Sequence, residues 1–202
     1  HVMICGKSNI DSKDNRYYLC VILFATICAL LYAQATSVFT PNTYSFDAAI
    51  FMHIGQAIKD GYVPYRDIYD IKGPMLWLIE YIGQLIHDGR AGIFLLQIIN
   101  LNAIAVISYK AARYYLTQLQ AVFCVMISIA FLIGTCRLSS AVEEFTYLYS
   151  ILAVCITLKN VQADKGFCKK RDFFVYGAAA MCAVSMRVTD CIIVGACIIY
   201  AG

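Results

Sequence analysis

Five apolar stretches, separated by polar segments, constrain this chain more than any other feature. About 20 apolar residues suffice for a helix to cross the hydrocarbon core of a bilayer. Only 14% of the 202 residues are charged, against about 25% in a soluble domain. The sequence therefore predicts an all-α, polytopic transmembrane helical bundle. The expected spans lie near 17–37, 91–109, 114–136, 142–158 and 173–200.

The first apolar stretch has a second interpretation. Ala33-Gln34-Ala35 has the small-x-small form of a signal-peptidase site, so a cleaved signal competes with a retained helix. The run is long for a signal and more spans follow, which favours the retained helix. Because the chain starts at His1 and stops at Gly202 inside an apolar run, we expect it to be part of something longer.

Basic residues indicate the orientation of the spans. Three regions share one side of the membrane if the five expected spans are right, and they hold ten of the sixteen Lys and Arg residues: Lys7, Lys13, Arg16, Lys110, Arg113, Lys159, Lys165, Lys169, Lys170 and Arg171. Short loops rich in Lys and Arg stay in the cytoplasm. We therefore expect a cytoplasmic N-terminus in the cell membrane, an external loop at 38–90 and a second external loop at "RLSSAVEE".

The segment "DGYVPYRDIYDIKGP" (60–74) stands out within the first external loop. We expect an amphipathic helix at the membrane surface before it and another helix after it, and its prolines indicate a fixed loop. Cations and tyrosines beside a bilayer suit a lipid-linked phosphate and a sugar ring. The simpler interpretation is a solvated loop with individually weak ion pairs. The candidate substrate-binding residues here are Tyr65, Arg66, Asp67, Asp70 and Lys72.

Three acids are candidates for catalysis. Asp47 follows the first span, where partial desolvation suits a carboxylate to act as a general base. Glu143 and Glu144 stand at the external mouth of the third and fourth spans, so one of them is expected to converge with Asp47. The simpler interpretation of all three is a charge favoured at the start of a helix.

Arg187 lies in the middle of the last expected span. A cation there costs at least a few kcal/mol unless it is paired or hydrated. Asp190, one turn further on, is the simple partner; the alternatives are a cavity that receives an anionic head group and the pathway of a transporter. The chain has no HxxxH, HExxH or zinc-spaced cysteine pattern, so no metal site or cofactor is expected, and a divalent cation is not indicated.

The first external loop resembles that of bacterial polyprenyl-phosphate-dependent glycosyltransferases of the GT-C fold, which include family-39, protein-mannosyltransferase-like and aminoarabinose-transferase-like proteins. Their pattern is an Asp soon after the first span, a G-x-x-P-Y-x-D turn, and K-G/P-P opening a helix. "SAVEEF" and "MRVTD" resemble later motifs of the family. The matching loop positions are Asp47, Gly61, Pro64, Tyr65, Asp67, Lys72, Gly73 and Pro74.

The resemblance implies an inverting transfer of a sugar from a polyprenyl-phosphate donor to a glycan, lipid or protein acceptor on the external face. Asp47 would deprotonate the acceptor, and Glu143 or Glu144 would be the second acid. Lys72 would bind the donor phosphate with help from Arg187. The family's usual chain has more spans, so the resemblance also implies that the C-terminal half is missing and that this portion alone is inactive or impaired.

Two other functional classes remain open, and neither involves nucleic acid. A transporter or flippase of lipid-linked sugars would line its pathway with Arg187 and Asp190, and an inactive membrane scaffold needs none of these side chains. The predicted polar residues gather at one external surface, which favours an enzyme over a transporter.

Overall fold

The computed structural model of the chain describes residues 14–33, 35–39, 45–162 and 170–201. The helices in these residues are α1 (Asp14–Tyr32), α2 (Phe46–Lys59), α3 (Pro74–Ile86), α4 (Arg90–Ala112), α5 (Gln118–Cys136), α6 (Val142–Gln162), α7 (Lys170–Met186) and α8 (Ile192–Ala201), with a 3-10 turn, η1 (Val188–Cys191), between the last two. The predicted all-α class is confirmed for this part of the chain. Some residues named above fall outside the described ranges: Lys7, Lys13, Gln34, Lys165 and Lys169.

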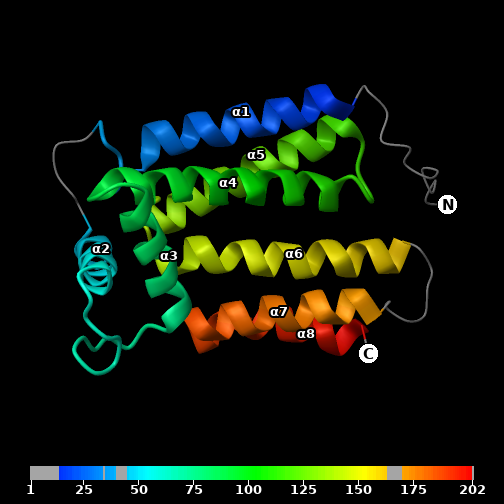
Figure 1. Cartoon of the computed structure of the whole chain (residues 1–202). Coiled ribbons are helices and arrows are strands. Elements are labelled where there is room, and N and C mark those ends of the chain that lie inside the picture. The colour runs from blue at the N-terminus through cyan, green and yellow to red at the C-terminus, as the bar shows by residue number, and fades with distance from the viewer. Residues whose placement is uncertain (1–13, 34, 40–44, 163–169, 202) are drawn as a thin grey trace.

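The long helices lie roughly alongside one another, and the α2–α3 pair closes one end of the bundle (Figure 1). The turns at 137–141 and 187–191 lie at this closed end. The start of α1, the α4–α5 connection, and the end of α6 with the start of α7 lie at the opposite end. The described polar connections therefore segregate into two sets, one at each end of the bundle.

In the described residues, three helices are long and apolar enough to cross a membrane: Asn15–Tyr32, Arg90–Ala112 and Gln118–Cys136. Large apolar side chains stay exposed on them; on α5 Leu119, Phe123, Ile127 and Phe131 recur every fourth residue. That spacing puts them on one face of the helix, and an exposed apolar face of this size suits lipid. The chain is therefore a candidate multi-pass membrane protein.

The structure differs from the expected single span at 173–200. α7 ends at Met186, and α8 returns beside α7 and α6, with Val194 and Cys197 packed near Ala153 and Ala179. The reason lies in the charged residues of the turn, Arg187 and Asp190. A chain reversal at the bundle end gives both charges access to water, which the middle of a span denies them.

α2 and α3 pack closely and dock on the bundle. A Cβ atom on Gly55 would lie 2.7 Å from the backbone carbon of Glu80, so only glycine permits this approach. Phe51 of α2 and Trp77 of α3 are buried in one apolar cluster with Phe145 of α6 and Met186 of α7. The cluster fixes the loop between α2 and α3 at the closed end, where the candidate site residues lie.

Candidate functional site

The loop between α2 and α3 holds its shape through its own contacts. The ring of Tyr65 lies 4.4 Å from that of Trp77, centroid to centroid, and its hydroxyl donates to the backbone oxygen of Lys72 at 3.3 Å. The backbone of Tyr65 is left-handed, with φ of 64°, which is uncommon for a residue with a side chain. Tyr65 therefore shapes the loop as well as presenting a half-exposed aromatic ring.

Three of the predicted substrate-binding residues make local contacts. Arg66 donates from Nε and Nη2 to the two carboxylate oxygens of Asp67, at 2.9 and 2.8 Å. Asp67 also accepts from the backbone amide of Val63 at 2.8 Å. The hydrogen bond from Arg66, followed by that from Val63, holds the pKa of Asp67 below its usual range. Asp70 accepts from the amide of Ile71, so Asp67 and Asp70 both serve the turn.

Gly73 joins this loop to the end of α7. Its amide donates to the backbone oxygen of Met186 at 3.1 Å. A Cβ atom at Gly73 would lie 1.6 Å from the backbone oxygen of Ser185, so no other residue fits without displacing the loop. The contact places the backbone of Lys72, the preceding residue, close to the backbone of Arg187, the residue after Met186.

Arg187 pairs with Glu143, at the start of α6, and not with Asp190. Asp190 instead accepts from the hydroxyl of Thr146 at 2.9 Å. The side chains of Arg187 and Glu143 are 44% and 47% exposed. Among the described residues, the simpler alternative, in which Asp190 neutralises Arg187, is therefore not found, because α7 ends at Met186 and the Arg187 side chain meets Glu143 of the neighbouring helix.

Glu143 and Glu144 are adjacent in sequence but have different environments. Glu144 is 1% exposed; its Oε2 accepts from Gln97 Nε2 at 2.5 Å, and its backbone oxygen accepts from Asn100 at 2.8 Å. Thr36 donates in turn to Gln97. Glu144 therefore ties the start of α6 to α4 and to the segment after α1. Glu143 is the one of the two that a ligand can reach.

Glu80 is a buried acid that the sequence analysis did not single out. Its side chain is fully buried on α3, and Oε1 accepts from Ser140 at 3.1 Å, while Oε2 has no partner among the described residues. Burial, and to a lesser extent the charge of Glu144, raises the pKa of Glu80 to about 8. The signal in the sequence was an acid inside the apolar run "MLWLIEYIG".

Asp47 lies exposed in the first turn of α2, which Ser45 caps by accepting from the amide of Ala48 at 3.3 Å. A carboxylate in a first turn interacts favourably with the helix dipole. The convergence of Asp47 with a glutamate stays a prediction.

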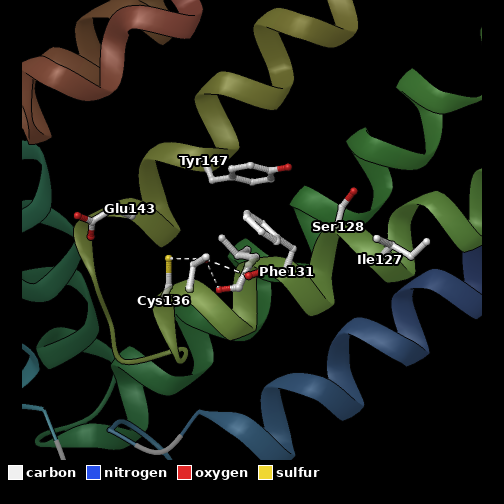
Figure 2. Close-up of a pocket in the computed structure, with 8 residues that line it drawn as sticks. Ile127, Ser128, Phe131, Cys136, Glu143 and Tyr147 are labelled. Carbon is white, nitrogen blue, oxygen red and sulfur yellow. Dashed lines mark hydrogen bonds between the residues drawn. The ribbon is translucent and has the colours of Figure 1, made fainter.

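An apolar groove of about 480 Å³ lies between α5 and α6 (Figure 2). Tyr147 from α6 and Phe131 from α5 face each other across it. Its lining residues are Ile127, Ser128, Phe131, Leu132, Thr135, Cys136, Glu143 and Tyr147. Glu143 thus belongs both to the groove and to the ion pair with Arg187. The volume falls in the range of ordinary ligand sites, about 300–1,000 Å³.

Metal binding has no visible basis in the described ranges, where no three His, Cys, Asp or Glu side chains are grouped to hold an ion. Comparisons of the chain with protein-family models, with curated proteins and with solved structures give no match. The resemblance of the 38–90 segment to a glycosyltransferase family therefore rests on the residues quoted above.

Proposed function

We propose that this chain is the N-terminal portion of a membrane glycosyltransferase. It would move a sugar, with inversion, from a polyprenyl-phosphate donor to an acceptor at the external membrane surface. The closed end of the bundle would be the external end, because ten of the sixteen Lys and Arg residues of the sequence fall in the three segments expected on the other side of the membrane. Excess Lys and Arg mark the cytoplasmic side of a membrane protein.

One observation carries the proposal: three connections far apart in the sequence meet at the closed end. Gly73 bonds to Met186, and Arg187 pairs with Glu143. The loop with the family-like motif, the start of α6 and the turn after α7 thus form one polar surface beside an apolar groove. A lipid-linked phosphate needs this combination, since its chain is apolar and its head group is anionic.

The described residues take distinct roles in this proposal. Arg187 binds the donor phosphate through charge-assisted hydrogen bonds, which are about twice as strong as neutral ones, and Lys72 adds a second positive charge. Tyr65 offers an exposed ring to the sugar. Asp47 takes the proton of the acceptor hydroxyl as the sugar is transferred, a contribution typically worth about 10² to 10⁴ in rate.

The test is transfer of radiolabelled sugar from polyprenyl-phosphate donors in membranes that contain the chain in its full natural length. Asp47→Asn is expected to lose at least about 10²-fold in rate while still binding the donor. Asp88→Asn is the matched control, because Asp88 is an exposed acid that pairs with Lys59 elsewhere at this end. Near wild-type turnover in Asp47→Asn would remove Asp47 from the role of base.

A second candidate function, transport of lipid-linked sugars, is favoured by a different observation. Glu144 is a buried ionisable side chain whose Oε2 accepts from Gln97, and such residues often mark ion or proton pathways in membrane proteins. A carrier would move a fluorescent lipid-linked sugar across vesicles containing the protein, without any transfer to an acceptor. If the lipid-linked sugar crosses the vesicle membrane and no sugar is transferred to an acceptor, the protein is a carrier and the glycosyltransferase proposal is wrong.

A further inference from the structure

The groove between α5 and α6 has an ion pair at its outer mouth. Glu143 lines the groove and also contacts Arg187 from the α7–α8 turn. Asp190, the other acid of that turn, already accepts from Thr146 and Thr189. Glu143 is therefore the anion that holds Arg187 in this structure, and its carboxylate lies at one end of the groove, turned away from Phe131 and Tyr147 (Figure 2).

Resting on the proposed function, we propose that the Glu143–Arg187 pair is a latch which the donor lipid opens. One isoprenoid chain lies in the groove, and its phosphate takes Arg187 from Glu143. The exchange fixes the phosphate at the groove mouth and leaves Glu143 as an unpaired carboxylate beside it. The latch thus couples donor binding to the release of an acid that is otherwise occupied.

The groove suits a hydrocarbon chain because the hydroxyl groups of Ser128 and Thr135 in its lining already donate hydrogen bonds to the backbone. The Ser128 hydroxyl donates to the backbone oxygen of Cys124 at 2.9 Å. The Thr135 hydroxyl donates to the backbone oxygens of Phe131 and Leu132, each at 3.0 Å. The remaining lining is apolar apart from Glu143 and the tip of Tyr147. From Ile127 to Cys136 the groove follows α5 for about 14 Å, which accommodates one segment of an extended chain.

The charges favour the exchange. Both partners of the pair are nearly half exposed, and ion pairs of this kind are weak. Arginine presents a planar fork of donors that matches two phosphate oxygens at once, so a phosphate replaces the carboxylate without loss of hydrogen bonds. Since Glu143 reaches water, its carboxylate stays hydrated after release. One outcome distinguishes a latch from a structural ion pair. In a latch, removing the charge of Glu143 strengthens donor binding, whereas removing the charge of Arg187 weakens it.

The experiment measures binding of radiolabelled undecaprenyl phosphate to the full natural protein in phosphatidylcholine nanodiscs. Glu143→Gln removes the competing anion and is expected to bind about two- to fivefold more tightly than wild type. Arg187→Gln is expected to bind at least about tenfold more weakly. Asp88→Asn removes the same charge from an ion pair away from the groove and is expected to match wild type. Weaker or unchanged binding in Glu143→Gln would overturn the latch.

The position of the chain is tested with two substitutions on α5. Ser128→Trp fills the groove and is expected to weaken binding at least about tenfold, whereas Ala130→Trp, on an exposed face outside the groove lining, is expected to leave it unchanged. If both substitutions weaken binding equally, the isoprenoid chain does not lie in this groove. If dioleoyl phosphatidic acid competes as strongly as undecaprenyl phosphate, the occupant of the groove is a bilayer phospholipid and the proposed isoprenoid is wrong. If wild type binds no undecaprenyl phosphate at all, the proposed function fails together with the latch; if it binds and only the variants disagree, the latch alone fails.

Discussion

Glu80 makes the stability of the protein depend on pH in a direction opposite to that of most surface acids. Its carboxyl group is fully buried, with Ser140 as its hydrogen-bond partner in the described chain. Burial raises its pKa from the usual 4.5 to about 8 in the folded protein. Between these values the folded state keeps a proton that the unfolded state has lost. Stability from this group is therefore complete below about pH 4.5 and is lost as the pH rises to about 8.

The size of the effect follows from the two pKa values. Each unit of difference is worth about 1.4 kcal/mol, so the loss between pH 4.5 and 8 is at most about 5 kcal/mol. The assay is chemical unfolding in detergent micelles at a series of pH values, followed by the fluorescence of Trp77, the chain's single tryptophan. Trp77 is buried one turn before Glu80 on α3, so its signal reports on this part of the structure.

Glu80→Gln removes this titrating group while keeping an acceptor for Ser140, and we expect its unfolding free energy to fall less steeply than that of wild type between pH 5 and 8. Asp88→Asn is the control, because the hydrogen bond and charge of Lys59 hold the pKa of Asp88 below its usual range and its titration lies under that window. The reasoning is refuted if wild type and Glu80→Gln show the same pH slope, or if the stability of wild type rises from pH 5 to 8.

Three further predictions concern the closed end of the bundle. Gly73→Ala forces a Cβ against the backbone of Ser185 and is expected to destabilise the protein by about 1–3 kcal/mol. Gly134→Ala has open space around the new Cβ and should not destabilise it. Equal stability of the two variants in the same unfolding assay would contradict this. In intact cells, an impermeant thiol reagent should label a cysteine placed at Ser45 and not one at Asn160, and the reverse pattern would invert the proposed orientation. Asp67→Asn removes the negative charge and one of the two carboxylate oxygens that accept from Arg66 and from the amide of Val63. Proteolysis of the 60–73 loop should then be faster than in wild type, and an unchanged rate would show that the Asp67 carboxylate does not hold the turn.

The helical class of the chain was predictable because apolar runs report directly on helices in a bilayer. The all-α fold follows from them, as does the presence of several long apolar helices. The break at 187–191 was harder to predict, since the run from 173 to 200 is apolar on both sides of it. The sequence places Arg187 and Asp190 inside a span, whereas in the structure they follow the end of α7, where water can reach them.

The partners of the candidate site residues were less predictable than the elements that carry them. The loop motif identified Lys72, Gly73 and Pro74 as a unit, but not that Gly73 would bond to Met186. Likewise the sequence suggested the nearby Asp190 for Arg187, because local spacing favours a partner one turn away. Glu143 is 44 positions from Arg187, and only the packing of α6 against α7 brings them together.

The central claim is that the closed end of the bundle binds the phosphate of a lipid-linked donor. The most direct measurement is photocrosslinking of the membrane-embedded protein with a polyprenyl phosphate that carries a photoreactive group beside its phosphate, followed by peptide mass spectrometry. The account predicts crosslinks within 60–74 and 187–191 and at Glu143, which excess unlabelled polyprenyl phosphate abolishes. Crosslinks concentrated at 110–117, the opposite end of the bundle, or distributed evenly along the helices would contradict it.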